Sequence, residues 1–351
     1  MLSKWVYEEC PGISAAHRDA ALARQAQLTK PAGSLGRLEQ LAIELAGLQR
    51  TERPRAAYVP IVIFAGDHGI VAQGVSAYPQ EVTIAMLSNF ASGGAAISVL
   101  ARELGSRLEV VDAGTLAEAP LPGVVTDKPR NGSRDFSKET ALEPKEVAFA
   151  MECGKRAVLR AAARGPDLLI FGEMGIGNTT TSAAIAAALL GIGAEQITGS
   201  GTGVDAAGLL HKVAVIDEAL ARRHLAEAGA SVENILCAVG GLEIVAICGA
   251  IITAAQQRFP VLIDGFIVSV AALAAVRLNP SCRPYLLASH QSAEQGHRLV
   301  LGALDVRPLI DLDLRLGEAS GAAIALPLLR LACALHNEMA TFAQANVPTA
   351  S

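Results

Sequence analysis

A glycine-rich turn carries the densest group of residues suited to binding an anion. An apolar run at residues 167–171 predicts a buried strand, which leads through Gly175 and Gly177 to a helix start at Asn178. Glycines let backbone N–H groups approach a ligand, and the positive end of the helix adds to the attraction. Thr180 stands where a dinucleotide fingerprint has its third glycine, and no P-loop Gly-Lys-Ser/Thr follows. The turn therefore predicts a site for one phosphate, with an ordinary turn and helix cap as the alternative.

A second glycine-rich loop, residues 198–203, has the same character, and Lys212 follows on an expected helix. Two such loops and one lysine would hold a phosphoribosyl group from two sides. Enzymes that use phosphoribosyl pyrophosphate usually carry two adjacent acidic residues after a strand. The nearest pair here, Asp217 and Glu218, lies within a helical pattern. The sequence therefore disfavours a pyrophosphate donor and its Mg²⁺.

A candidate general base lies near the end of the chain. Glu318 is flanked by small residues in an otherwise apolar stretch, residues 315–323. Partial desolvation raises the pKa of a carboxyl toward the range useful for a base. Arg315 precedes it by three residues and would orient it or bind an anion. A glutamate that only satisfies backbone amides at a helix start is an equally good interpretation.

Histidines and cysteines raise the question of a metal site. Residues 66–69 (Gly-Asp-His-Gly) follow an expected strand, and His290, Glu294 and His297 share a plausible helix. No His-x-x-x-His or His-Glu-x-x-His motif is present, so a loop-stabilising Asp-His turn is favoured over metal. No two of the six cysteines form a Cys-x-x-Cys pair, which favours buried, reduced thiols.

The elements that position these residues alternate between strand and helix. Apolar runs predict strands at residues 58–65, 107–112, 167–171, 234–239, 260–263 and 284–287. Helical patterns occupy residues 14–50, 81–103, 144–163, 178–190, 204–227 and 315–344, with a break at residues 30–36 and Ser34 as the cap of a helix at residues 35–49. Residues 117–143 predict a long loop. The alternation predicts an α/β fold with a mainly parallel sheet, helices on both faces, and ligands at the carboxyl ends of the strands.

Composition sets limits on the class of protein. The chain has 351 residues, 51% of them hydrophobic and 18% charged, which is enough for a sizeable core. With 29 basic and 34 acidic residues the net charge is −5, so the basic excess of a general nucleic-acid binder is missing. Mean hydropathy is +0.37, yet the longest nearly apolar runs fall short of the roughly 18 residues that span a bilayer. The first five residues contain no apolar signal region, and a cytoplasmic location is expected.

Ordered motifs along nearly the whole chain give a resemblance to a known family. The chain resembles the nicotinate-nucleotide–dimethylbenzimidazole phosphoribosyltransferases of cobalamin lower-ligand synthesis. The motifs that carry it stand at residues 30–39 (KPAGSLGRLE), 65–69 (AGDHG), 93–97 (GGAAI), 172–180 (GEMGIGNTT), 239–243 (VGGLE), 261–266 (VLIDGF), 289–294 (SHQSAE) and 315–323 (RLGEASGAA).

The resemblance implies both an architecture and a reaction. It implies a Rossmann-like catalytic domain at residues 56–324, a small helical domain from residues 1–55 and 325–351, and a homodimer. The reaction is a pentosyl transfer without metal or cofactor, in which the 5-phosphoribosyl group passes from nicotinate mononucleotide to 5,6-dimethylbenzimidazole. The products are α-ribazole 5′-phosphate and nicotinate.

The family's functional positions fall on motif residues of this chain. The catalytic base falls on Glu318, and the acidic residue of the first glycine-rich turn falls on Glu173. The phosphate and ribose positions fall on Gly175, Ile176, Gly177, Asn178, Thr179, Thr180, Gly201, Thr202, Gly203 and Lys212, with Arg315 added as an anion partner. Base-pocket positions fall on Tyr78, Met86, Met174, Leu316 and Gly321. Many relatives carry Gln two residues after Thr83, where this chain has Ala85, so the choice among benzimidazole, purine and phenolic acceptors stays open.

This chemistry suits the residues. The pyridinium nitrogen of the donor leaves as a neutral ring, so no general acid is needed. Glu173 would stabilise positive charge at C1′, and Glu318 would remove the proton from the attacking benzimidazole. A non-catalytic paralogue that acts as a subunit or binding module is one alternative, and the presence of Glu318 argues against it. A dehydrogenase is the other, and the missing third glycine argues against that.

Overall fold

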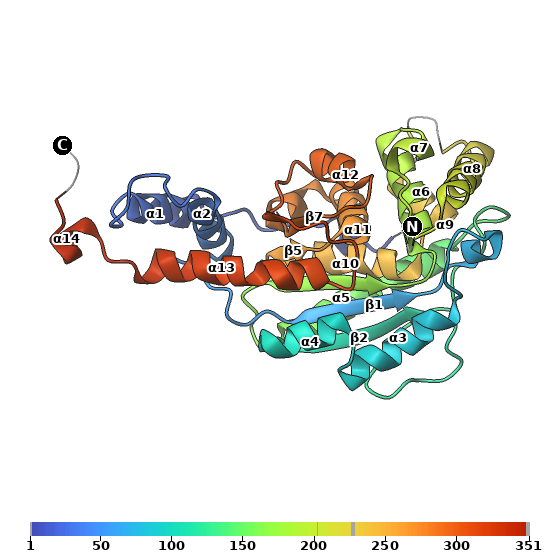
Figure 1. Cartoon of the computed structure of the whole chain (residues 1–351), viewed down its shortest axis with the longest axis horizontal. Coiled ribbons are helices and arrows are strands. Elements are labelled where there is room, and N and C mark those ends of the chain that lie inside the picture. The colour runs from blue at the N-terminus through green and yellow to red at the C-terminus, as the bar shows by residue number, and fades with distance from the viewer. Residues whose placement is uncertain (1, 202, 226–228, 349–351) are drawn as a thin grey trace.

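The computed structural model describes residues 2–201, 203–225 and 229–348 and is built on a six-stranded parallel sheet (Figure 1). The strand order is β3-β2-β1-β4-β5-β6, and every neighbouring pair runs parallel. The strands are β1 (Ile61–Gly66), β2 (Leu108–Gly114), β3 (Val125–Thr126), β4 (Leu169–Met174), β5 (Val261–Ile263) and β6 (Leu286–Ala288). The order reverses between β1 and β4, so the switch point of the sheet, where such folds bind ligands, lies between these two strands. The predicted α/β fold is confirmed.

The strands are apolar throughout because both faces of the sheet are covered. Along β1, Val62 and Phe64 belong to one buried cluster, while Ile61 and Ile63 belong to the other. This period of two is what a pleated strand with two buried faces requires.

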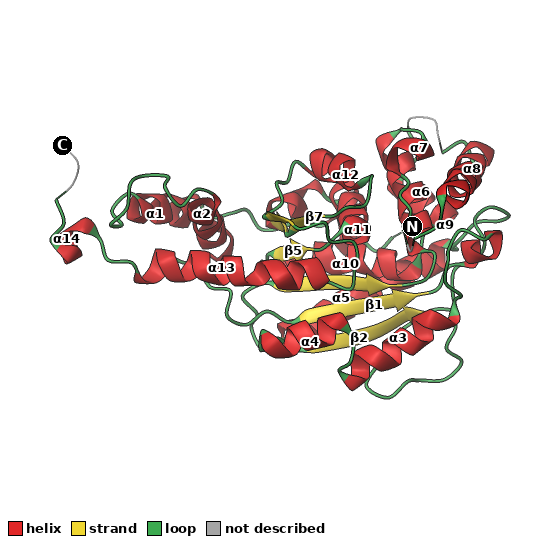
Figure 2. Ribbon diagram, viewed as in Figure 1, coloured by secondary structure: helices red, strands yellow, loops and turns green. Residues whose placement is uncertain are grey.

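Helices form a layer on each face (Figure 2). One cluster contains α5 (Pro144–Ala162), α6 (Asn178–Leu190), α10 (Leu242–Gln256) and α11 (Phe266–Leu278). The other contains α3 (Glu81–Ser92), α4 (Ala96–Glu103) and α13 (Ser320–Glu338). Small residues set the spacing within a layer: a Cβ on Gly154 of α5 would stand 1.9 Å from the Ala246 carbonyl oxygen of α10.

A helical lobe extends from the sheet domain along α13 (Figure 1). It contains α1 (Ala15–Gln25), α2 (Arg37–Gln49) and the far half of α13, with α14 (Phe342–Ala345) beyond. The short helix η1 (Lys4–Tyr7) lies elsewhere, since Asn279 and Gln256 of the sheet domain donate hydrogen bonds to the carbonyl groups of Val6 and Trp5. The division into a small helical domain of residues 1–55 and 325–351 and a catalytic domain of residues 56–324 stays a prediction.

The remaining elements complete the edges of the molecule. They are η2 (Gly69–Gln73), α7 (Ala194–Ile197), α8 (Ala206–Arg222), α9 (Val232–Val239), η3 (Pro280–Tyr285), α12 (His297–Leu304) and a two-stranded parallel sheet of β7 (His290–Gln291) and β8 (Ile310–Asp311).

Three local predictions were wrong. The apolar run at residues 234–239 is the helix α9, begun by a Ser231 side chain that accepts the Asn234 N–H, and not a strand. The helix α2 begins at Arg37 after Gly36, whose φ of 54° only glycine adopts readily, so Ser34 is not its cap. His290 and His297 do not share a helix, because His290 lies in β7.

One helical stretch is longer and more apolar than expected from the short apolar runs. In the described part of the chain, Glu81–Glu103 is the only stretch long and apolar enough to cross a membrane by length and composition. The structure divides it into α3 and α4 at residues 93–95, where Gly93 has a φ of 89°. Core helices pass the same test, so the stretch is weak grounds for a membrane span.

The six cysteines, all within the described residues, are unpaired, and five of them are buried. Burial raises the pKa of the Cys153 thiol and of the Cys248 thiol well above the ordinary value. The prediction of unpaired thiols is confirmed.

Candidate active site

A cavity of about 720 Å³ opens at the carboxyl edge of the sheet, beside the switch point. Segments that follow β4, β5 and β6 form most of its wall. Its lining comprises Tyr78, Val82, Met86, Glu173, Met174, Gly175, Ile176, Asn178, Thr179, Gly201, Asp264, Gly265, Phe266, Ile267, Val268, His290, Ser292, Glu294, Asp313, Leu314, Arg315, Leu316, Gly317 and Glu318.

Glu318 enters the cavity from a strained turn. Three successive residues, Gly317, Glu318 and Ala319, have positive φ angles of 82°, 58° and 62°. A non-glycine residue in this region costs on the order of 1–3 kcal/mol, and such strain is concentrated at functional sites. The turn lies directly on β4, since a Cβ on Gly172 would stand 2.5 Å from the Ala319 nitrogen. The Glu318 carboxyl is buried, and its Oε2 has no partner among the described residues.

Glu173 reaches the same cavity from the end of β4. Its side chain is buried and accepts a hydrogen bond from the Asn178 amide at the start of α6. A Cβ on Gly317 would stand 2.2 Å from Glu173 Oε1. A side chain at position 317 would push against the Glu173 carboxyl, and the φ of 82° also favours glycine there.

The two carboxyls are strongly perturbed. Burial, helped by the nearby charges of Asp264, Glu243 and Glu318, raises the pKa of Glu173 to about 8. Burial and then the charge of Asp264 raise the pKa of Glu318 to about 7. Asp264 is itself fixed by the Ala322 N–H at 2.9 Å. Both carboxyls therefore keep their protons to a higher pH than an ordinary glutamate does.

The amino end of α6 supplies the donors of an anion site. Gly177 precedes the helix with a φ of 93°, and the turn residues Gly175 and Ile176 line the cavity. Asn178 and Thr179 follow on the first helical turn and line it too. The helix end is positive, so this corner of the cavity favours a phosphate.

Lys212 joins the two glycine-rich loops. Its buried ammonium donates to Thr179 Oγ1 at 2.9 Å and to the Gly199 carbonyl at 3.1 Å. Gly201 is wedged between these groups, because a Cβ there would stand 2.5 Å from Thr179 Oγ1 and 3.2 Å from Lys212 Nζ. Burial lowers the pKa of Lys212 to about 8, and Glu294 opposes that shift. An anion beside Lys212 would favour its charged form.

Apolar side chains form another part of the lining, called the apolar wall below. Tyr78, Val82 and Met86 contribute to it from α3 and the segment before, and Met174, Leu316 and residues 266–268 contribute from other elements. A flat apolar ring would be desolvated here, next to the two carboxyls.

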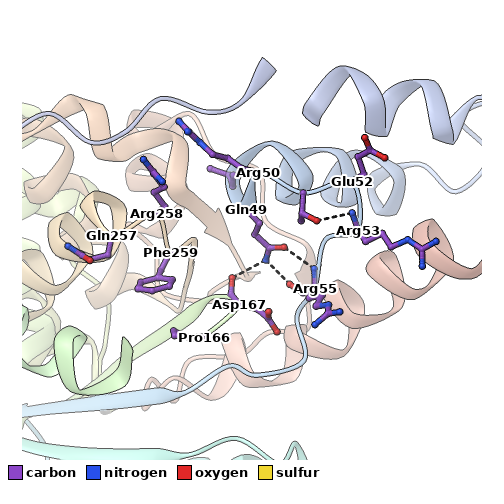
Figure 3. Close-up of a pocket in the computed structure, with 12 residues that line it drawn as sticks. Gln49, Arg50, Glu52, Arg53, Arg55, Pro166, Asp167, Gln257, Arg258 and Phe259 are labelled. Atoms are coloured by element: carbon purple, nitrogen blue, oxygen red, sulfur yellow. Dashed lines mark hydrogen bonds between the residues drawn. The ribbon is translucent and has the colours of Figure 1, made fainter. Parts of the chain in front are cut away.

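A second cavity, of about 740 Å³, lies at the opposite, amino edge of the sheet (Figure 3). Exposed arginines surround it, namely Arg50, Arg53, Arg55 and Arg258. Its one carboxylate from the sheet domain, Asp167, already accepts the backbone N–H groups of Ala57 and Tyr58. It has no buried carboxyl facing it and lies away from the switch point, so the carboxyl-edge cavity is the candidate active site.

Comparisons with known proteins agree with this geometry. A family model described as a phosphoribosyltransferase matches residues 10–347. The chain belongs to this phosphoribosyltransferase family. It is 78% identical over 348 residues to the nicotinate-nucleotide–dimethylbenzimidazole phosphoribosyltransferase of Bradyrhizobium diazoefficiens, with 99% of each chain covered. It is 67% identical over 347 residues to the protein of the same name from Bradyrhizobium sp. strain ORS 278, again with 99% of each covered. The crystal structure of the Thermus thermophilus protein of that name matches with a TM-score of 0.91 at 42% identity, covering 96% of this chain and 100% of that one.

Most residues predicted for the site line the cavity. These are Glu173, Glu318, Gly175, Ile176, Asn178, Thr179, Gly201, Arg315, Tyr78, Met86, Met174 and Leu316. Four others are not lining residues: Gly177 caps α6, Thr180 is fully buried, Gly203 stands in an exposed loop, and Gly321 lies against the His290 ring. Lys212 acts on the wall through Thr179, and Thr202 lies outside the described residues.

Several lining residues stand outside the set predicted for the site. Asp264 and residues 265–268 follow β5, and His290, Ser292 and Glu294 follow β6. Their position after two short apolar runs was the available signal, because every strand of a parallel sheet ends at the same edge.

The Asp-His turn is structural, as predicted. His68 contacts Glu243 and Thr181, and Asp67 accepts the Leu116 N–H at 2.8 Å. Among the described residues no three His, Cys, Asp or Glu side chains are grouped as metal ligands.

The raised pKa of Glu318 predicts that Glu318→Gln stabilises the fold at alkaline pH. The unfolded chain loses this proton near pH 4.5 and the folded chain near pH 7, so wild-type stability falls as pH rises through that window. Glutamine removes this cost. We therefore expect the difference in unfolding free energy between the variant and wild type to be about 1–3 kcal/mol more favourable to the variant at pH 8.5 than at pH 5. Urea unfolding at both pH values measures it, with the exposed Glu218→Gln of α8 as the control. An advantage that does not change with pH would contradict the desolvation of Glu318.

Proposed function

We propose that the chain transfers the 5-phosphoribosyl group of nicotinate mononucleotide to 5,6-dimethylbenzimidazole, giving α-ribazole 5′-phosphate and nicotinate. The name of the relatives and the family match support this reaction. The observation that carries it is that two buried, perturbed carboxyls line one cavity together with a glycine-rich turn suited to phosphate and a set of apolar side chains.

The donor would lie with its phosphate at the amino end of α6. Backbone N–H groups of the turn, the Asn178 and Thr179 side chains, and the Lys212 ammonium would hold that phosphate. This anchor directs the ribose toward Glu173. Glu173 lies in β4, five positions before Asn178, and accepts a hydrogen bond from the Asn178 side chain. Arg315, which is exposed, and Glu294, which is buried, line the same cavity, and the charges of Lys212 and Arg315 both act on Glu294.

Glu173 would act on the ribose as positive charge develops. A bound pyridinium cation favours the ionised form of a nearby carboxyl and so opposes the raised pKa of the free site. The resulting carboxylate stabilises C1′ as the bond to the pyridinium nitrogen breaks. The electron pair of that bond returns to the ring nitrogen, and nicotinate leaves with a neutral pyridine ring and without a proton donor.

Glu318 would act on the acceptor. The benzimidazole ring lies against the apolar wall, one nitrogen attacks C1′, and the other nitrogen loses its proton to the Glu318 carboxylate. A pKa near 7 suits a base that works at neutral pH. Holding both substrates in attack geometry supplies the rest of the acceleration.

We further propose that the chain acts in the cytoplasm as a homodimer on small molecules alone, in assembly of the cobalamin nucleotide loop. Tyr78 and Leu316 support a second copy near the site, because both are large, apolar and more than half exposed at the cavity rim. Sedimentation equilibrium tests the dimer.

The reaction is tested by incubating the protein with nicotinate mononucleotide and a panel of benzimidazoles, adenine and phenols, without added metal. Chromatography and mass spectrometry follow nicotinate and the new riboside phosphate. We expect product with benzimidazoles, and the ranking of acceptors defines the apolar wall. Absence of product with every acceptor, from folded protein, would favour a subunit or binding module.

We predict that Glu318→Gln lowers turnover by about 10²–10⁴-fold, because it removes the base and little else. Donor affinity by calorimetry should stay within about twofold, as expected for a group outside the phosphate corner. Wild-type turnover should rise with pH through about 7, where Glu318 ionises, and the variant should lose this rise. Near-wild-type turnover in the variant would remove Glu318 from the role.

We predict that Gly177→Val weakens donor binding at least about tenfold, because a side chain displaces the turn from the phosphate. The φ of 93° disfavours any side chain, and a Cβ would stand 2.6 Å from Val71 Cγ2. Gly191→Val is the matched control, since Gly191 has a φ of 65° at the other end of α6 and no atom within 4 Å of its Cβ position. Equal donor affinity in wild type and Gly177→Val would count against the phosphate assignment.

A further inference from the structure

The Asp-His turn after β1 has no part in the reaction described above, yet it holds a buried ion-pair geometry. His68 Nε2 lies 2.7 Å from Glu243 Oε1, and both side chains are fully buried. The other ring nitrogen, Nδ1, lies 2.9 Å from Thr181 Oγ1. One imidazole therefore links the end of β1, the first turn of α10 and the first turn of α6.

The ring also forms the floor of the phosphate-binding turn. A Cβ on Gly175 would stand 3.2 Å from His68 Nε2 and 2.1 Å from the Gly66 carbonyl oxygen. A Cβ on Gly177 would stand 3.3 Å from His68 Cβ. The turn thus rests on His68 with no space between them, and movement of the ring would move the turn.

Further contacts hold both the ring and the backbone of His68. A Cβ on Gly241 would stand 2.3 Å from His68 Cε1, so the backbone before α10 closes one side of the ring. Gln80 donates to the His68 carbonyl at 2.9 Å. Contacts at both ring nitrogens, with Glu243 at Nε2 and Thr181 at Nδ1, fix the orientation of the ring.

A neighbouring contact fixes the turn in the same way. The Ile176 N–H donates to the hydroxyl of Thr83, a buried residue of α3, at 3.2 Å. The orientation of the turn's amides is therefore set by contacts beneath it as well as by its own glycines.

We propose that His68, held by Glu243 and bonded to Thr181, is a positioning residue that fixes the amino end of α6 for the donor's phosphate. Neither His68 nor Glu243 lines the cavity, so both act through the turn. The proposal rests on the proposed function, because it takes the amino end of α6 as the phosphate site.

Thr181→Val is the decisive variant, because it removes one hydroxyl and keeps the shape of the side chain. His68→Ala is less suitable, since it leaves the Glu243 charge buried and unpaired and so tests folding as well. Ser182→Ala is the matched control: Ser182 is the next residue of α6, equally buried, and its hydroxyl has no partner among the described residues. Thr181→Ser, which restores the hydroxyl, tests rescue.

The measurement compares binding of nicotinate mononucleotide with binding of nicotinate riboside, which lacks the phosphate, by calorimetry. We expect Thr181→Val to weaken the mononucleotide about five- to tenfold and to leave the riboside within about twofold. The KM of the donor should rise in parallel, while the KM of the acceptor stays unchanged. Ser182→Ala should match wild type, and Thr181→Ser should recover most of the loss.

Two results would overturn the proposal. Equal mononucleotide affinity in Thr181→Val and wild type would show that the hydroxyl bond does not hold the turn. An equal loss for mononucleotide and riboside would show a general structural defect. Failure of the wild-type protein to bind nicotinate mononucleotide is a separate outcome, which would reject the proposed function itself.

Discussion

Desolvation of two carboxyl groups is the constraint on which the rest of this structure depends. Glu173 and Glu318 are buried with Asp264 and Glu243 close by, so each is held away from its ordinary ionisation. Backbone geometry holds the two carboxyls in this buried position. Three residues of positive φ bring Glu318 to β4, and glycines at positions 172 and 317 let the turn lie against the strand. A site built this way is poised to exchange protons at neutral pH and to stabilise a cation.

The sheet topology places the other parts around these carboxyls. The strand order reverses between β1 and β4, and the cavity opens at the carboxyl edge beside this point. The turn after β4 occupies this position together with the positive end of α6, and the Asp-His turn after β1 supports it from below. The apolar wall draws on α3 and the start of α11 as well as on Met174 and Leu316. Under the proposed function the phosphate and the acceptor ring would therefore bind to different parts of the cavity.

Local sequence patterns predicted much of this arrangement. The strand, turn and helix at residues 167–190 were predictable because apolar periodicity, glycines and a helix start agree there. The run at residues 234–239 was not, because a short apolar segment fits a strand or a buried helix equally well, and the Ser231 cap decides for the helix. The partnership of His68 with Glu243 was invisible, since it joins side chains 175 residues apart. The roles of Asp264 and His290 in the lining also depend on how the strand ends meet, and no local pattern encodes that.

The most direct test of the account is a titration of the two carboxyls themselves. Carbon-13 NMR of protein labelled at the glutamate carboxyl carbons, with Glu173→Gln and Glu318→Gln for assignment, follows each group as pH changes. The account predicts that Glu318 titrates near pH 7 and Glu173 near pH 8 in the free protein, far above the ordinary value of 4.5. Titration of both groups below pH 5 would contradict it, because the site would then hold two ordinary solvated carboxylates.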